Sequence, residues 1–245
     1  MQVIYGMNPV RETLRNENVA IDRILIAKGR KGRDMDAITR QAAHRGLSIA
    51  YRDKEHLTRI SGTASHQGIV CICKEYAYVS IDDVIEHRHD SFENSVVLVL
   101  DSIEDPQNLG SIIRTAYALG INGLIIPEHR AAPVTPAVIK VSAGAARHIP
   151  VARVVNIAQA LDHLKERNFW IYGADASAPS TLEALDFSGN VGLVMGSEGK
   201  GIRPLVRKKC DALVSIQMDG NFDSLNVSVA TGIILYQISR RRRHC

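Results

Sequence analysis

Short apolar runs alternate with amphipathic stretches along the first 75 residues. The runs have the length and β-branched content of strands: IDRILIA (21–27), LSIAYR (47–52) and HQGIVCICK (66–74). The stretches between them have helical spacing: NPVRETLRN (8–16) and GRKGRDMDAITRQAAHRG (29–46). We expect Asn8 to cap the first helix and Pro9 to occupy its first position. This order predicts a small mixed α/β domain over residues 1–75.

From residue 96 the apolar runs become stronger and alternate regularly with helical patterns. Six runs predict buried strands: SVVLVLD, GLIIP, IPVARV, FWIYGAD, VGLVMG and DALVSIQ. The last helix is expected in LNVSVATGIILYQISRR (225–241). Regular alternation favours a parallel sheet with helices on both faces, in an α/β domain over 96–245. The polar, charged segment 76–95, with one short helical stretch, is interpreted as a linker.

Charge is unevenly distributed over these regions. Residues 1–75 hold 13 basic and 8 acidic residues, whereas 76–95 hold one basic and five acidic residues. A basic first domain suggests a polyanionic partner. No apolar run reaches the roughly 18 residues of a membrane span, and the N-terminus lacks a signal pattern, so a cytoplasmic protein is expected.

The cysteines and histidines do not predict a metal site. Cys71 and Cys73 lie two positions apart in an expected strand, so their side chains share a face. No partner ligands follow at a useful spacing, and the nine histidines are scattered. Both cysteines are interpreted as small buried apolar residues, and no metal is expected.

Polar residues gather after three of the expected strands. Arg114 is the only charge between Asp105 and Glu128. Glu198 lies in the glycine-rich loop LVMGSEGKGI (193–202), where glycines allow backbone N–H groups to approach a ligand. Ser224 is expected to cap the last helix, with Asn226 in its first turn. The carboxyl ends of parallel strands form a crevice, so these four side chains are expected to converge there. An ion pair of Arg114 with Glu104, Asp105 or Glu198 is the structural alternative.

Three stretches in this order resemble the motifs of the SpoU branch of the knotted SPOUT methyltransferases: DPQNLGSIIRTA, VMGSEGKGI and DSLNVSVATGI. The segment VSAGAARHIPV is similar to the one that separates the first two motifs in that family. The opening VIYGMNPVRETL resembles the small RNA-binding domain that precedes many of these enzymes. Among them, the likeness is greatest to the guanosine 2′-O-methyltransferases of bacterial 23S ribosomal RNA.

The resemblance implies S-adenosylmethionine as cofactor, in a bent form against the loops after the last strands. The residues implied are Met195, Gly196, Gly201, Ile216 and Leu225. It also implies a homodimer and a deep trefoil knot around the last helix, which composition and periodicity do not reveal.

For catalysis the resemblance implies methyl transfer to a ribose 2′-hydroxyl. Arg114 would grip a phosphate and stabilise the developing alkoxide, since an arginine stays protonated. Asn108 and Glu198 would support it, and Ser224 and Asn226 would contact the ribose or the cofactor. In the first domain the RNA contacts are expected in KGRKGR (28–33), at Lys28, Arg30, Lys31 and Arg33.

Four other interpretations remain open from the sequence. The first two are a transfer RNA ribose methyltransferase and a ribosomal RNA methyltransferase that acts on adenosine to give antibiotic resistance. A non-catalytic RNA-binding or ribosome assembly protein would carry a degenerate site. A dinucleotide-dependent dehydrogenase is disfavoured because G-x-G-x-x-G does not follow a first strand. The C-terminal RRRRHC is either an RNA contact or a solvated end.

Overall fold

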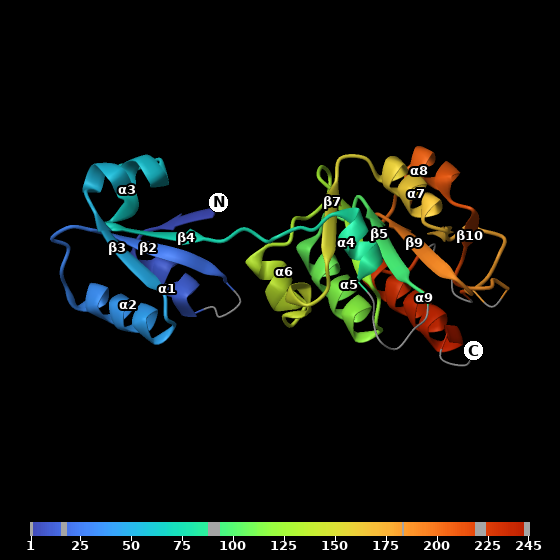
Figure 1. Ribbon diagram of the computed structural model, residues 1–245, viewed down its shortest axis with the longest axis horizontal. Helices are drawn as coiled ribbons and strands as arrows, with labels where there is room; N and C mark the ends of the chain where they lie inside the picture. Colours follow the sequence, from blue (N-terminus) through green and yellow to red (C-terminus); the bar gives the residue numbers. More distant parts are fainter. Residues whose placement is uncertain (1, 16–18, 88–93, 183, 219–223, 243–245) are drawn as a thin grey trace. The chain divides into compact units, whose positions relative to one another are not determined.

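A computed structural model describes residues 2–15, 19–87, 94–182, 184–218 and 224–242. The chain divides into two compact units, Met1–Ala77 and Tyr78–Cys245 (Figure 1). Each unit has a sheet of its own, with helices on both faces. No helix in the described ranges is both long and apolar enough to cross a membrane.

The N-terminal unit contains a four-stranded mixed sheet in the order β1-β4-β2-β3. Strand β4 pairs antiparallel with both β1 and β2, and the pair formed by β2 and β3 is parallel. The strands are β1 (Gln2–Tyr5), β2 (Ile21–Ala27), β3 (Ser48–Arg52) and β4 (Ile69–Cys73). The helices are α1 (Met7–Arg15), α2 (Arg33–His44), α3 (Lys54–Ser61) and the short 3₁₀ turn η1 (Ala64–His66).

Strand β4 is buried on both faces because helices cover both sides of this sheet. Ile69, Cys71 and Cys73 pack with residues of α1 and α2, whereas Val70 and Ile72 pack around Leu57 of α3. The two cysteines therefore share a face, with their sulfurs 3.9 Å apart, and act as small buried apolar residues as predicted. Within the described residues no group of three His, Cys, Asp or Glu side chains is placed to hold a metal ion.

Two local predictions for this unit need correction. Helix α1 begins at Met7, directly after Gly6 with its positive φ of 92°, so Asn8 lies inside the helix and does not cap it. The sequence pattern also missed β1 and α3. Gln2–Tyr5 is too short to show a clear period, and Lys54–Ser61 buries only Leu57 completely.

The C-terminal unit contains a six-stranded sheet in the order β10-β8-β9-β5-β6-β7, and every neighbouring pair is parallel. This confirms the predicted α/β fold class. The strands are β5 (Val96–Asp101), β6 (Gly123–Pro127), β7 (Val151–Val154), β8 (Phe169–Ala174), β9 (Asn190–Gly196) and β10 (Ala212–Val214). The helices are α4 (Ile81–Glu86), α5 (Pro106–Ala118), α6 (Pro136–Val141), η2 (Ala145–Arg147), α7 (Ile157–Glu166), α8 (Pro204–Lys209) and α9 (Val227–Arg242).

Helices cover both faces of the parallel sheet. Residues of α4, α7 and α8 pack on one face, against side chains such as Val97 and Val99 of β5. On the other face α5 packs with α6 and α9 (Figure 1). Because successive side chains of a strand point to opposite faces, both sets of neighbours require apolar residues, which explains the unbroken VVLVL of β5.

The segment predicted as a linker, 76–95, belongs largely to the C-terminal unit. The boundary between the units lies after Ala77, and the Val79 N–H donates to the Val151 carbonyl at 3.0 Å. Helix α4 then starts at a capping box in which Ser80 and Asp83 exchange hydrogen bonds. Helix α4 is the short helical stretch expected in this segment, and Val84 is its only fully buried residue.

The two central strands, β5 and β9, define where a ligand can bind. They are paired in register from Val96 opposite Val191 to Asp101 opposite Gly196. Their connections leave in opposite directions, since β5 continues to β6 and β9 continues to β10 on the far side. Ligands of open parallel sheets bind at such a switch point, outside the carboxyl ends of the strands. The knot implied by the family resemblance stays a prediction.

The C-terminal arginines Arg241 and Arg242 lie at the opposite end of this sheet, where its strands begin. Arg242 donates to the carbonyls of Gly189 and Ser95, at 2.8 and 3.3 Å, just before β9 and β5 begin. Arg241 donates to the Leu185 carbonyl and lies over the Phe187 ring. Burial lowers the pKa of Arg242 to about 10. Arg241 and Arg242 are therefore structural, whereas residues 243–245 of the predicted tail lie outside the described part.

We predict that Arg242→Met lowers the free energy of unfolding of the C-terminal unit by about 1–3 kcal/mol, because two carbonyls lose a charged donor. The change can be followed in urea through the fluorescence of Trp170, the single tryptophan, in β8. Arg240→Met is the matched control, since Arg240 is exposed and has no partner in the described part of the chain. Equal stability of the two variants would contradict this role.

Candidate functional site

Three connections meet through the side chain of Glu198. Its Oε1 accepts hydrogen bonds from Asn108 Nδ2 at 3.2 Å and from Asn226 Nδ2 at 2.6 Å. The Val227 N–H also donates to this oxygen, at 3.4 Å. Asn226 Nδ2 donates in addition to Asn108 Oδ1 at 3.0 Å. The loops after β5, after β9 and before α9 are thereby joined at the carboxyl edge of the sheet.

The start of α9 differs from the prediction at Ser224. The helix begins at Val227, and Asn226 Oδ1 accepts from the N–H and the hydroxyl of Ser228, at 2.9 and 2.6 Å. Asn226 is therefore the N-cap, and Ser224 precedes it by two residues. This explains an asparagine that a helix interior would disfavour. It also leaves Ser224 exposed at the edge of a pocket.

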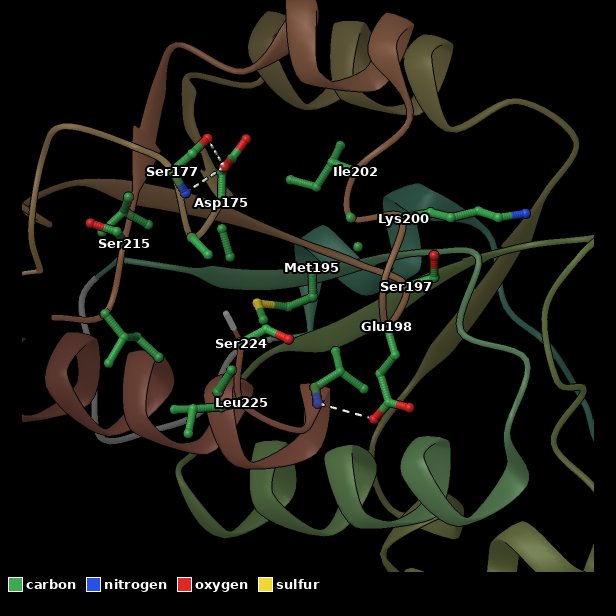
Figure 2. A pocket seen from close by; sticks show the side chains of 18 of the residues that line it. Asp175, Ser177, Met195, Ser197, Glu198, Lys200, Ile202, Ser215, Ser224 and Leu225 are labelled. Carbon is green, nitrogen blue, oxygen red and sulfur yellow. Dashed lines mark hydrogen bonds between the residues drawn. The ribbon is translucent and has the colours of Figure 1, made fainter. Parts of the chain in front are cut away.

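A pocket of about 770 Å³ opens beside this cluster (Figure 2). Its walls come from the ends of β8, β9 and β10 and from the start of α9. The residues predicted for a cofactor all line it: Met195, Gly196, Gly201, Ile216 and Leu225. Glu198 and Ser224 line it as well. Its volume lies within the roughly 300–1,000 Å³ typical of small-molecule sites.

Gly196 lets the glycine loop fold back on itself. A Cβ at this position would lie 2.1 Å from the carbonyl carbon of Gly201 and 2.3 Å from the Ile202 nitrogen. Ser197 and Gly201 exchange backbone hydrogen bonds of 3.1 and 2.9 Å across the turn. Gly199 and Gly201 adopt positive φ, so the turn requires glycine there for a different reason. The result is a narrow loop whose backbone forms one wall of the pocket.

Two polar pairs at this edge were not found from the sequence. Asp101, fully buried at the end of β5, accepts from the backbone N–H, Nε and Nη2 of Arg203, at 2.8, 2.6 and 2.6 Å. This pair fixes the end of the glycine loop to the central strand. Asp101 was visible only as the polar end of an apolar run, and its partner lies 102 residues away.

The second pair lies at the far side of the pocket. Asp175 Oδ1 accepts from the Ser177 N–H and hydroxyl, and its Oδ2 accepts from Arg207 Nε at 2.8 Å. These bonds, that of the Ser177 hydroxyl first, lower the pKa of the Asp175 carboxyl. Asp175 and Arg207 both line the pocket, so they present an ionised pair to any ligand in it.

Arg114 does not join this cluster. It is exposed on α5, has no hydrogen bond or ion pair in the part of the chain that the structure describes, and is absent from the pocket's lining. The alternative of an ion pair with Glu104, Asp105 or Glu198 is therefore not observed there. The helix around it is buried through other residues, including Ile112, Ile113 and Ala116.

The basic residues predicted for RNA lie on the loop that follows β2 in the N-terminal unit and, for Arg33, at the first position of α2. Lys28, Arg30, Lys31 and Arg33 are all exposed. Lys28 forms a 3.2 Å ion pair with Asp53, whereas the other three have no partner among the described residues. Gly29 and Gly32, at positive φ, shape this loop.

Family models match both units of the chain. Residues 95–236 match the SpoU rRNA Methylase family, and residues 3–79 match the RNA 2′-O ribose methyltransferase substrate binding domain. The chain belongs to the SpoU methylase family. The first match includes the three connections joined by Glu198, and the second includes the basic loop of the N-terminal unit.

Relatives of the SpoU chain align over nearly its whole length. A Bacillus subtilis protein assigned to the TrmH family of tRNA/rRNA methyltransferases is 41% identical, over 98% of this chain and 95% of its own. The 23S rRNA (guanosine-2′-O-)-methyltransferase of Xanthomonas campestris is 37% identical, over 98% and 97%. A Streptomyces viridochromogenes SpoU methyltransferase solved with AdoMet is 26% identical, with a TM-score of 0.65 over 98% and 89%.

We predict that Gly196→Ala abolishes ligand binding in the 770 Å³ pocket, because the added Cβ collides with backbone and forces the loop open. Calorimetry with S-adenosylmethionine measures this. Gly199→Ala, in the same loop, is the control: no atom lies within 4 Å of its Cβ, so only backbone strain of about 1–2 kcal/mol is added. Similar affinities for the Gly196 and Gly199 variants would contradict the close packing of the loop.

Proposed function

We propose that this SpoU methyltransferase transfers a methyl group from S-adenosylmethionine to the ribose 2′-hydroxyl of a guanosine in 23S ribosomal RNA. The class, a methyltransferase that acts on RNA ribose, follows from the two family matches. The guanosine and the 23S RNA rest on the 37% identical Xanthomonas campestris enzyme. The observation that carries the proposal is the Asn108–Glu198–Asn226 cluster at the mouth of the 770 Å³ pocket.

The residues of the pocket fit S-adenosylmethionine. A glycine at 196 leaves room that a Cβ would fill, so backbone groups can approach a ligand closely. Met195, Ile216 and Leu225 supply apolar walls, and the Asp175–Arg207 pair supplies charge at the rim for a zwitterionic end. When bound, this cofactor provides an electrophilic sulfonium methyl, which needs no metal for activation.

The chain's own residues then have to orient a weak nucleophile. Holding the 2′-hydroxyl in line contributes on the order of 7–11 kcal/mol to lowering the barrier. Asn108 and Asn226 are fixed by hydrogen bonds to Glu198, which lines the pocket, so their positions are set before the RNA arrives. Arg114 is free to bind a phosphate and to stabilise the developing alkoxide, because no partner in the described residues occupies its guanidinium.

The N-terminal unit recruits the RNA through its basic loop. Arg30, Lys31 and Arg33 are exposed where this loop leads into α2, and none of the three has a partner among the described residues. Neutralising phosphates with such side chains gives salt-dependent affinity. Transfer RNA is the second candidate substrate, because the name of the 41% identical Bacillus subtilis relative covers both RNA classes.

The deciding experiment is transfer of a labelled methyl group to separated RNA classes, followed by mapping of the modified ribose. The proposal expects label at a guanosine 2′-oxygen of unmodified 23S rRNA. Label confined to transfer RNA would establish the second candidate instead. Absence of label from every RNA class, with cofactor bound, would leave a binding protein and contradict an RNA methyltransferase.

We predict that Arg114→Ala lowers single-turnover methylation by about 10²–10³-fold while the melting temperature and cofactor affinity stay unchanged. Arg114→Lys should restore little, since an ammonium cannot make the planar, two-pronged contact with a phosphate. Because the side chain is exposed and unpaired within the described structure, folding does not depend on it. A folded Arg114→Ala protein with near wild-type turnover would exclude this role.

We also propose that two chains pair through an apolar surface on α9. Val229, Ile233 and Tyr236 are exposed along one side of this helix, opposite the face that buries Ile234 and Ile238. They border a hollow of about 380 Å³, which Leu182, Gly232 and Gln237 also line. A helix that is apolar on two sides needs a second neighbour, and the family resemblance implies another copy of the chain.

Accordingly, Ile233→Glu should convert a dimer into a monomer near the chain mass of 26.9 kDa, because it places a charge within the apolar surface. Sedimentation equilibrium measures the mass directly. Lys208→Glu, which adds an acid at an exposed position on α8, should leave the dimer intact. A wild-type protein that is active as a monomer would refute the pairing.

A further inference from the structure

A second pocket, of about 480 Å³, borders the first. The two share one wall, formed by Ser197, Glu198, Lys200, Gly201 and Val227. The remaining walls are the connection from β5 to α5, residues 102–105, together with Asn108, Arg130, Arg203 and Pro204. A ligand in the second pocket would therefore meet a ligand in the first at the Glu198–Asn108 cluster.

Most of the charges around this second pocket are already engaged. Arg203 is bound to Asp101, Asp105 caps α5 through the Gln107 N–H, and Glu198 accepts from both asparagines. Of the described residues that line the pocket, Arg130 and Lys200 are the cations without a partner. The positive groups available to an incoming ligand are therefore these two.

Arg130 is held in an unusual backbone conformation. Its φ is 57°, in the left-handed region that favours glycine or asparagine. The surrounding loop fixes it on both sides: the Glu128 N–H donates to Val154, and the Ala132 N–H donates to Ile103, each at 2.8 Å. Strained residues that persist in a fixed loop are concentrated at functional sites. The loop thus presents one arginine to the pocket at a conformational cost.

We propose that the second pocket receives the target nucleotide and that Arg130 binds a phosphate next to the methylated ribose. This assignment rests on the proposed function. A ribose that meets the cofactor at the shared wall carries phosphates on its 3′ and 5′ oxygens, one bond from the sugar. A guanidinium binds a phosphate through two parallel hydrogen bonds, which fixes orientation as well as position. Arg130 is then a positioning residue for the ribose, separate from Arg114 on α5.

The test uses the full-length protein with two probes, an unmodified 23S rRNA transcript and an unmodified tRNA transcript. Arg130→Gln should raise the KM for the methylated RNA by about 10–100-fold, as expected for losing hydrogen bonds from a charged group. Its S-adenosylmethionine affinity should stay unchanged. The slope of log affinity against log salt should fall by about 0.7 for one lost phosphate contact. Lys208→Gln removes a charge on α8 that is also exposed and has no partner among the residues described, and it should change none of these values.

Arg130→Gly shows whether weaker RNA binding comes from loss of the arginine–phosphate contact or from loss of folded protein. Glycine relaxes the left-handed backbone, so this variant should melt at or above the wild-type temperature and still bind RNA as weakly as Arg130→Gln. Unchanged KM and salt slope in both variants would overturn the assignment, as would a loss confined to cofactor affinity. If the wild-type protein methylates neither transcript, the proposed function fails. The salt slope, which needs no methyl transfer, then still decides whether Arg130 contacts RNA.

Discussion

The site depends on the hydrogen bonds that the Glu198 carboxylate accepts. One of its oxygens accepts from side chains 90 and 28 residues away in sequence and from the first N–H of α9. Without it, the β5–α5 connection, the glycine loop and the start of α9 would have no common point. Within the described residues Asn108 Nδ2 would also lose its acceptor, and Asn226 Nδ2 would keep only its 3.0 Å bond to Asn108 Oδ1. Leaving a buried polar group unpaired is costly.

The central strands of the sheet hold the loop that carries this carboxylate. Strands β5 and β9 end opposite each other, with Asp101 beside Gly196, and the Asp101–Arg203 pair returns the glycine loop to the central strand. Gly196 then allows the loop to turn within van der Waals distance of itself. Glu198 is thus placed by a buried charge pair on one side and a missing Cβ on the other. In this position Glu198 lines both of the adjoining pockets.

At the opposite end of the sheet, where the strands begin, two arginines bind backbone carbonyls. Arg241 and Arg242 donate to carbonyls that precede the strands, so the last turn of α9 is tied to the sheet rather than to a ligand. A run of arginines at a chain end looks like an RNA contact, but these two side chains are used within the fold. Charge along a sequence is therefore a better guide to function where the fold does not use it. Arg30, Lys31, Arg114 and Arg130 are such positions, since none has a partner within the described ranges.

The sequence by itself determined the α/β class, most strands and helices, and the three motif loops. These follow from local periodicity: an unbroken apolar run such as VVLVL is buried on both faces whatever its neighbours are. The short or weakly buried elements β1 and α3 gave too little periodic signal. Only the tertiary structure decided that Asn226 and not Ser224 caps α9, and that Asp101 meets Arg203. The cap is a local contact that depends on where α9 begins. The Asp101–Arg203 pair depends on strand order, which brings residues about a hundred positions apart to one edge, and local sequence patterns do not encode that order.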